Sequence, residues 1–410
     1  MAAADAPFVL TRRMALPQTG TNRRGSIQLF PWGDDSVAQI FNAKWRTSEG
    51  WSKMVSEFSD AFLVGYGESM YILHTSPRNS ACRSLKDTVG NTGGADETPQ
   101  VAWGLRSAYP FDPLALFASH RRIFVFNVRQ NKIVGYIRGH GGVTNYLDSV
   151  HPTSPNIFAS TSADFTTRIY DLDYEAHQNS ENAVWPPWDG PSHASAAHGT
   201  DGSDSQGSGI GRCVQILVGG RSGGHVWDVL GAVFHPRLPL IATCGADRHV
   251  KIWRTRSNPS EAALLEDKPL FSARITTSRV LSVAWLSDDT ILIHTATTST
   301  PTRMGLEEHE ETPVSDDEQE PTPLNYITPG TIDIFQWSGL SRFFPAGETP
   351  EAVLRGGASD YQESKSYTVL STERLIPPQP QPEIQTQLLE PISNISQPQD
   401  DPFIRTEYEQ

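Results

Sequence analysis

Cysteine is scarce in this chain, with three in 410 residues, at Cys82, Cys213 and Cys244. Their spacing shows no pairs, so neither a disulfide framework nor a zinc site is expected, and buried or free thiols in a reducing compartment fit better. Long apolar runs are missing too. No stretch of about 18 uncharged apolar residues occurs, which excludes a predicted membrane span. The first ten residues are too weakly apolar for a secretory signal.

Motifs that carry catalysis or bind phosphate are also missing. The sequence contains no Gly-rich phosphate loop, no His-Glu-x-x-His and no nucleophile elbow. The stretch "GGRSGG" (219–224) precedes a histidine and a predicted strand instead of opening a helix, so we interpret it as a loop. These absences predict a protein that is not an enzyme and that uses no metal ion or cofactor.

Positive charge is in deficit, because 33 Lys and Arg face 47 Asp and Glu, for a net charge of -14. Direct binding to a nucleic-acid backbone needs a basic surface and is not expected. Eight of the acids lie in "LEEHEETPVSDDEQE" (306–320). Such a block is typical of a solvated, disordered loop, and the rest of the chain is only mildly acidic.

What the sequence does contain is a repeated strand pattern. Five short runs alternate apolar with polar residues, and each follows a small or turn-prone cluster, which predicts a hairpin turn followed by a strand. The runs are "SMYILH" (69–74), "RIFVFNV" (122–128), "TRIYDL" (167–172), "VKIWRT" (250–255) and "TIDIFQW" (331–337).

The spacing of these runs indicates a propeller. Ile123 and Ile169 are 46 residues apart, close to the roughly 40–45 residues of one four-stranded blade. The next two intervals, from Ile169 to Ile252 and from Ile252 to Ile334, are nearly twice as long. Each contains an insertion, and removing it brings the interval back towards one blade. The insertions predicted in this way are 175–211 and 297–328. The 51-residue interval between Ile72 and Ile123 likewise contains a predicted insertion, 76–97.

Two blades carry fuller signatures, at 138–171 and 223–254. Both show Gly-His, a strand, His-Pro, a second strand, an aspartate turn and an aromatic residue. His140 precedes Asp164 by 24 residues and His225 precedes Asp247 by 22, and each aspartate precedes its aromatic by 6. Two signatures in register predict an all-β fold of the WD-repeat β-propeller type.

The repeated acid and histidine are predicted to be structural. A carboxylate can accept the backbone N–H groups of a tight turn, the imidazole can bond the carboxylate, and the aromatic closes a buried network. Recurrence at the blade period favours this role over catalysis. The predicted network residues are His140, Asp164, Tyr170, His225, Asp247 and Trp253.

The middle of the chain resembles the EED/extra-sex-combs family, the WD-repeat subunit of Polycomb repressive complex 2. The resemblance rests on collinear motifs from about residue 36 to 337, which match about five blades of that family's seven-bladed propeller. The motifs include "GHGGVTN", "HPTSPN", "GGHVWDVLGAVFHP", "ATCGADRHVKIWR" and "RVLSVAWLSDDTILIHT".

The resemblance implies a function. Members of that family are nuclear scaffolds without catalytic activity. They bind a SET-domain methyltransferase of the Enhancer of zeste type and other Polycomb subunits, and they hold trimethyl-lysine of histone H3 in an aromatic cage by cation–π attraction, for gene repression. Asn145 matches a residue that holds the histone-tail backbone. Val37 and Pro99 match the first two cage positions and are not aromatic, so a complete cage is not expected.

The predicted organisation is a flexible segment at 1–35, a propeller at 36–375 and a disordered Pro/Gln-rich tail at 376–410. A sixth and a seventh blade are not recognisable after Trp337, so those blades have diverged or the chain is truncated. "SYTVLSTERL" (366–375) is predicted to supply one further strand pair. Two other functions stay open: a different WD-repeat adaptor, such as a ubiquitin-ligase substrate receptor, and a propeller hydrolase that uses Asp164.

Overall fold

A computed structural model of the chain describes most of the predicted propeller. The described residues are 26–32, 49–66, 69–74, 81–84, 100–107, 111–148, 151, 154–176, 207–220, 223–255, 263–301, 325–344 and 362–375. The segments 306–320 and 376–410 and the residues Val37 and Pro99 lie outside them. Within the described ranges, no helix is long and apolar enough to cross a membrane.

The described strands form five antiparallel four-stranded units, with the second and third joined into one larger sheet. The first comprises β1 (Ser26–Leu29), β2 (Ala61–Tyr66), β3 (Ser69–His74) and β4 (Ala81–Ser84). The second comprises β5 (Gln100–Leu105), β6 (Pro113–Ser119), β7 (Arg122–Asn127) and β8 (Lys132–Ile137). The third comprises β9 (Thr144–Asp148), β10 (Ile157–Ser162), β11 (Thr167–Glu175) and β12 (Gly207–Leu217).

The fourth unit comprises β13 (Val229–Phe234), β14 (Leu240–Gly245), β15 (Val250–Arg254) and β17 (Phe271–Ala273). The fifth comprises β18 (Val280–Trp285), β19 (Thr290–Thr295), β22 (Thr331–Trp337) and β23 (Tyr367–Arg374). The remaining elements are β16 (Leu264–Glu266), the hairpin of β20 (Thr298–Pro301) and β21 (Asn325–Thr328), and the helices α3 (Glu49–Phe58) and α6 (Leu340–Phe343).

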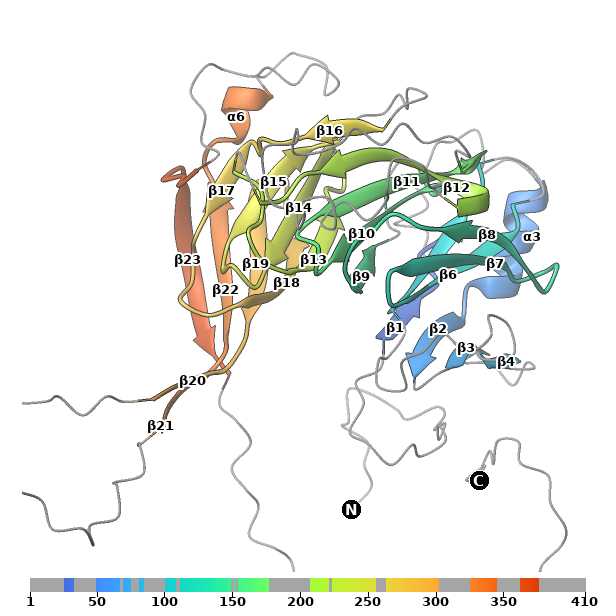
Figure 1. Ribbon diagram of the computed structural model, residues 1–410, viewed down its shortest axis with the longest axis horizontal. Helices are drawn as coiled ribbons and strands as arrows, with labels where there is room; N and C mark the ends of the chain where they lie inside the picture. Colours follow the sequence, from blue (N-terminus) through green and yellow to red (C-terminus); the bar gives the residue numbers. More distant parts are fainter. Residues whose placement is uncertain are drawn as a thin grey trace, which may run out of the picture.

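The five units are stacked in chain order as blades. Their first strands β1, β5, β9, β13 and β18 pack one against the next, and Figure 1 shows the sheets following one another in an arc from β1–β4 in blue to β22 and β23 in orange. Among the described elements, the first and fifth blades share no comparable packing. The arrangement confirms the all-β propeller prediction and its count of about five blades.

The five alternating runs of the sequence coincide with the third strand of every blade, namely β3, β7, β11, β15 and β22. A third strand is hydrogen-bonded to a neighbour along both of its edges, so it lies inside its sheet. In β7 and β15 nearly every residue is buried. The alternation therefore records how residues on the two sides of the strand are packed between blades.

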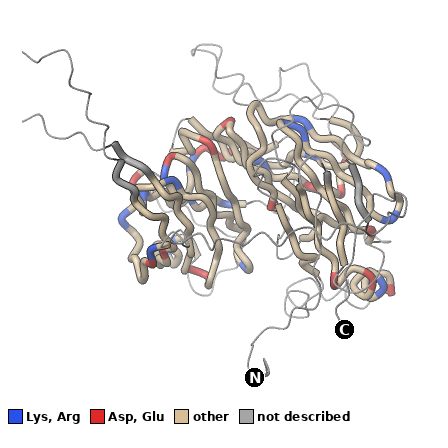
Figure 2. The backbone as a smooth tube through the Cα atoms, turned by 90° about the horizontal axis from the view of Figure 1, so that it is seen from below, with Lys and Arg blue, Asp and Glu red and all other residues tan. Residues whose placement is uncertain are grey.

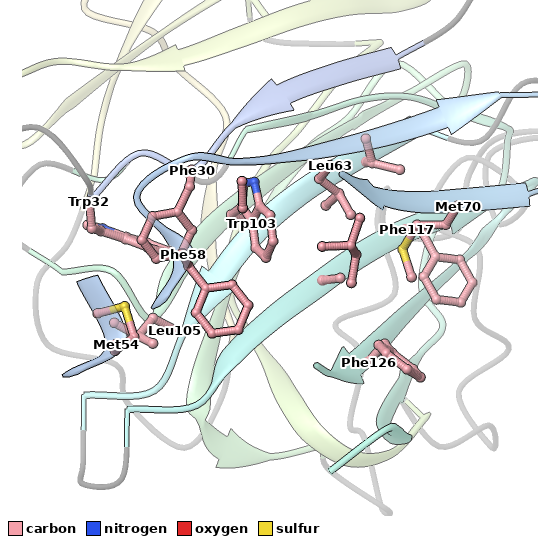
Figure 3. Close-up of a cluster of buried hydrophobic side chains, with 14 of the residues drawn as sticks. Phe30, Trp32, Met54, Phe58, Leu63, Met70, Trp103, Leu105, Phe117 and Phe126 are labelled. Atoms are coloured by element: carbon pink, nitrogen blue, oxygen red, sulfur yellow. The ribbon is translucent and has the colours of Figure 1, made fainter. Parts of the chain in front are cut away.

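The hydrophobic core is divided among the interfaces between blades. Four clusters of buried side chains fill the four gaps between consecutive blades, in chain order. Figure 3 shows the first cluster, where Trp103 of the second blade lies beside Phe30 and Phe58 of the first. Helix α3 contributes Trp51 and Met54 to it, because its apolar side faces the sheet. This stacking fixes the angle between neighbouring blades.

Several strands lie where the sequence predicted none. The first blade begins at β1, inside the predicted flexible segment 1–35. Strand β4 lies inside the predicted insertion 76–97, β12 begins inside 175–211, and β20 and β21 lie inside 297–328. Four of these are four-residue strands, too short to show a period, and β12 opens with "GSGIG", a composition that resembles a linker. The segment 366–375 is one strand, β23, which completes the fifth blade, so the predicted strand pair was wrong.

Strand β12 ties the second blade to the third. Its first residues pair with β8 and its later residues pair with β11. The pairing brings the backbone of Gly207 and Gly209 so close to β8 that a Cβ on either residue would lie about 2 Å from a carbonyl oxygen, 1.8 and 2.1 Å respectively. Both glycines also have positive φ, +136° and +70°. Glycine is therefore required here both by conformation and by space.

Candidate functional site

The fourth blade brings His225, Asp247 and Trp253 into one buried chain of hydrogen bonds. The Nδ1 of His225 lies 2.9 Å from Asp247 Oδ2, and its Nε2 lies 2.8 Å from Thr243 Oγ1. The indole N–H of Trp253 donates to the same Thr243 oxygen at 2.8 Å. With a neutral ring, the threonine hydroxyl donates to His225 and His225 donates to the carboxylate, so every member is satisfied.

The third blade repeats this chain. The Nδ1 of His140 lies 3.0 Å from Asp164 Oδ2, and its Nε2 lies 2.6 Å from Ser160 Oγ. The other Asp164 oxygen accepts the backbone N–H and the hydroxyl of Thr166, at 2.9 and 2.6 Å. Tyr170 occupies the position of Trp253 and stacks on Phe158, with ring centroids 4.9 Å apart.

Each aspartate also holds the turn around it. Asp164 accepts the backbone N–H of Gly141 at 2.8 Å. Asp247 accepts those of Val226 and His249, both at 3.1 Å. The aspartates therefore join the loop that enters the blade to the turn between its second and third strands, as the sequence predicted for a carboxylate at this position.

A buried cation accompanies each aspartate, two residues before the aromatic. In the fourth blade Lys251 donates to Ser272 at 2.7 Å, and burial lowers the pKa of Lys251 to about 8. In the third blade Arg168 is buried to the same degree. Both cations favour the ionised form of the neighbouring carboxylate.

Burial fixes the protonation states. It lowers the pKa of His140 and of His225, so both rings are neutral at pH 7. Burial alone would raise the pKa of Asp164, but the His140 ring and the hydrogen bonds around the carboxyl hold that pKa at about 2. The pair is thus a neutral imidazole donating to a carboxylate, and it gains nothing by exchanging a proton at neutral pH.

The same geometry bears on catalysis. The side chains of both His–Asp pairs are only 1–2% exposed, so a substrate has no path to either carboxylate. Across the described ranges, no group of three or more His, Cys, Asp or Glu side chains is arranged to hold a metal ion. Cys213 and Cys244 are buried free thiols, and burial raises the pKa of each, which makes both poor nucleophiles.

His235, of the second predicted His-Pro pair, closes the turn between β13 and β14. Its Nδ1 accepts the backbone N–H groups of Arg237 and Leu238, at 3.0 and 2.8 Å, and its Nε2 donates to the carbonyl of Asp288 in the fifth blade at 3.0 Å. In the third blade His151 packs edge-on against Phe234. Both histidines therefore lie between neighbouring blades.

Asn145, the predicted histone-tail residue, lies in β9 and is half-buried. Its side-chain N–H donates to the carbonyl of Val229 in β13 at 3.0 Å. The bond joins the first strands of the third and fourth blades. The amide oxygen of Asn145 and the second N–H of its amide group remain for a ligand.

Sequence comparison matches the two blades that contain these networks. The family model of the WD domain, G-beta repeat, matches residues 131–171 and 211–254. The matched segments run from β8 into β11 and from β12 through β15, and each contains one His–Asp pair. The fold is a WD-repeat β-propeller. No curated protein matches the chain in sequence.

Solved structures with similar folds include Polycomb complexes. Chaetomium thermophilum Polycomb Repressive Complex 2 bound to GSK126 aligns with a TM-score of 0.48 and 19% identity, over 77% of this chain and 57% of that chain. The complex with H3K27me3 and H3K27M gives the same TM-score and identity, over 77% and 55%. A Mitotic Checkpoint Complex chain aligns at 0.37 and 14%, over 58% and 56%. The WD-repeat chain thus spans little more than half the length of these chains, and alignments this loose carry no argument about function.

The sequence prediction missed two members of the networks. Ser160 and Thr243 each lie four residues before the aspartate and bond the imidazole of their blade. Their matching positions were a usable signal, because a neutral imidazole that donates to a carboxylate needs a hydroxyl donor for its second nitrogen. The buried cations Arg168 and Lys251 also match in position.

Proposed function

We propose that this WD-repeat chain is a non-catalytic scaffold subunit of a histone H3 methyltransferase complex of the Polycomb repressive complex 2 type. Its partners would be a SET-domain methyltransferase of the Enhancer of zeste type and the other subunits of that complex, in the nucleus, for gene repression. The observation that carries the proposal is the collinear series of motifs from about residue 36 to 337 that resembles the EED/extra-sex-combs family. The propeller fold is compatible with this role, since it presents loops at both ends of the blades on a rigid frame.

The six network residues have a structural role in this proposal. His140 with Asp164 and Tyr170, and His225 with Asp247 and Trp253, fasten the loop and the turn at one end of their blades. Their burial and the hydrogen bonds of the two His–Asp pairs support this role over catalysis. They therefore keep the interaction loops in place without touching a partner.

Histone-tail binding at Asn145 is part of the proposal with a narrower chemistry than the sequence suggested. One side-chain N–H of Asn145 is bonded to Val229, and we propose that a tail is held through the amide oxygen, which accepts a backbone N–H. Replacing Asn145 with Asp keeps the acceptor and removes the bond to Val229. Replacing it with Ala removes both, and comparison of the two separates tail binding from blade packing.

The test of the function is affinity purification of the tagged protein from nuclear extract, with mass spectrometry of what is recovered. We expect a SET-domain methyltransferase in near-stoichiometric amount. Recovery of a cullin adaptor without a methyltransferase would replace the proposal with the ubiquitin-ligase alternative. Hydrolase activity that is lost in Asp164→Asn while the protein stays folded would replace it with the enzymatic one.

A further inference from the structure

Exposed cationic and aromatic side chains gather at one end of the fourth and fifth blades. The loop before β13, the turn between β14 and β15, and the loop between β17 and β18 all lie at this end, because successive strands are antiparallel. We name the Arg–Trp surface by its five residues in these loops: Val226, Trp227, Arg248, Arg274 and Arg279.

Backbone hydrogen bonds hold the first part of this surface together. The N–H of Val226 donates to Asp247 Oδ2 at 3.1 Å, and the N–H of Ala246 donates to the carbonyl of Asp228 at 2.8 Å. The loop that carries Val226 and Trp227 is therefore bonded on both sides to the turn that carries Arg248.

The two other arginines adjoin the same turn and loop. Ala273 pairs with Val250, so Arg274, the next residue, emerges beside the 247–249 turn. Gly231 of β13 lies against the backbone of Leu281 in β18. The first strands of the fourth and fifth blades thus run side by side, and Arg279 emerges beside the end of β13 that follows Trp227.

The apolar side chains of the surface, Val226 and Trp227, are not part of the hydrophobic core. Trp227 is 63% exposed and Val226 is 51% exposed, whereas the other tryptophans of the described ranges are buried or half-buried. A tryptophan on a well-anchored loop loses little conformational freedom when a partner covers it. Tryptophan and arginine are also the side chains most often responsible for affinity in protein interfaces.

The charge of the surface is opposite to that of the chain. Arg248, Arg274 and Arg279 are exposed, and within the described residues none forms an ion pair or a side-chain hydrogen bond. The neighbouring acids are few: Asp247 is engaged by His225, Glu363 lies 3.2 Å from His249, and Asp228 is half-buried. Figure 2 shows how the charged residues are distributed over the backbone, mostly in turns and at strand ends.

We propose that the Arg–Trp surface binds an acidic segment of a partner protein that inserts a large apolar side chain against Trp227 and Val226. The arginines would form charge-assisted hydrogen bonds with the acidic side chains, and the apolar contact would supply the anchor. The exposed apolar side chains of Trp227 and Val226 favour a partner with a large apolar side chain of its own, so the geometry points to a peptide. This site goes beyond the proposed function, since neither its chemistry nor its test involves a methyltransferase.

The test measures fluorescence anisotropy of a labelled peptide of about twelve residues that alternates Glu or Asp with Leu and Phe, a length chosen to span two neighbouring blades. We expect saturable binding that weakens as salt is added. Trp227→Ala should weaken it about tenfold, and Arg248→Ala or Arg279→Ala about threefold each. Arg106→Ala, an exposed arginine in the loop between β5 and β6 at the opposite end, is the matched control and should leave the affinity unchanged.

Four results would overturn the proposal that this surface binds an acidic partner. The acidic peptide fails to bind, or binds all variants equally. A peptide with Lys in place of every acid binds as tightly. An oligouridine RNA binds more tightly than the peptide and loses affinity in the same variants. Finally, a variant with the acids of 306–320 replaced by Ser binds the peptide about tenfold more tightly, which would make the protein's own acidic stretch the occupant.

Discussion

Individual residues account for the rigidity of the two matched blades. In the third and in the fourth blade, one carboxylate accepts hydrogen bonds from an imidazole N–H and from the backbone N–H groups of two separate segments. The second nitrogen of each imidazole is bonded to a hydroxyl, from Ser160 or Thr243. A network of this kind is stabilising only while every member has its partner. The loss of a single hydrogen-bond donor or acceptor is therefore expected to lower the stability of the fold strongly.

Replacement of Asp247 by Asn tests this dependence. The amide group would direct N–H donors at His225 and at backbone N–H groups, and an unsatisfied buried group would remain. We expect the free energy of unfolding to fall by about 2–4 kcal/mol, measured by urea denaturation. Asp228→Asn is the matched control, because that carboxyl lies in the same loop and forms no hydrogen bond among those described. It should change stability by less than about 0.5 kcal/mol. If the two variants lost the same free energy of unfolding, the hydrogen bonds of Asp247 would not stabilise the blade.

The buried histidines predict how stability depends on pH. Burial lowers the pKa of His140, His225 and His235, and brings that of His151 to about 4. In the unfolded chain histidine has a pKa near 6.5. Below this pH the unfolded state therefore binds protons that the buried histidines of the folded state do not bind. Stability is therefore full above about pH 7 and falls as the pH drops through 6.5 and below.

Asp164 acts in the same direction at lower pH. Its pKa of about 2 in the folded chain lies below the ordinary 3.8, so its contribution is lost only as the pH falls below about 4. The measurement is the melting temperature from pH 8 to pH 5. We expect a plateau above pH 7 and a steady decrease below pH 6.5, whereas a melting temperature that rises on acidification would contradict neutral buried histidines.

At the scale of elements, β12 is the strand that joins two blades. Gly209 has a φ of +70° and room for no Cβ, since one would lie 2.1 Å from the Val134 carbonyl oxygen. Gly220, in the next loop, has a φ of +80° and nothing within 4 Å of its Cβ position. Both glycines therefore adopt a positive φ, but only Gly220 has room for a Cβ atom.

Alanine at these two positions separates the two effects. Gly220→Ala should lower the free energy of unfolding by about 1 kcal/mol, from the positive φ alone. Gly209→Ala should lower it by about 2–4 kcal/mol, because the β8–β12 pairing must also open or shift. Hydrogen exchange of the β8 amides should rise in Gly209→Ala only. If both variants lose the same stability, β12 does not pair with β8 in solution.

Elements differ in how well the sequence predicted them, for a physical reason. The third strands were predicted because they alternate and follow a turn. Strands β1 and β4 have four residues each and show no period, and the start of β12 owes its extended conformation to pairing with β8, far away in the sequence. At the site, the repeated spacing singled out His225, Asp247 and Trp253, but the link between His225 and Trp253 runs through Thr243, which the spacing did not reveal. The exposure of Trp227 was not predictable, because it depends on the packing of loops from two blades.

At the scale of the whole molecule, stability is shared among the gaps between blades. Each of the four clusters contains side chains of two consecutive blades. A smaller cluster of Val64, Tyr71 and Leu73 lies within the first blade. Each blade is therefore held by its neighbours, and the loops at its ends inherit that rigidity. This is the physical reason why a WD-repeat protein suits the role of a scaffold, with interaction surfaces at the loops and fasteners beneath them.

The most direct measurement of the central claim is reconstitution with a SET-domain methyltransferase of the Enhancer of zeste type. We predict that the two proteins, when co-expressed, elute together in size-exclusion chromatography, and that methylation of histone H3 by the complex exceeds that by the methyltransferase alone. Asp228→Asn should leave both results unchanged, whereas Asp247→Asn should weaken the association in proportion to its loss of folded protein. Separate elution of two folded proteins, with methylation unaffected by the WD-repeat chain, would contradict the account.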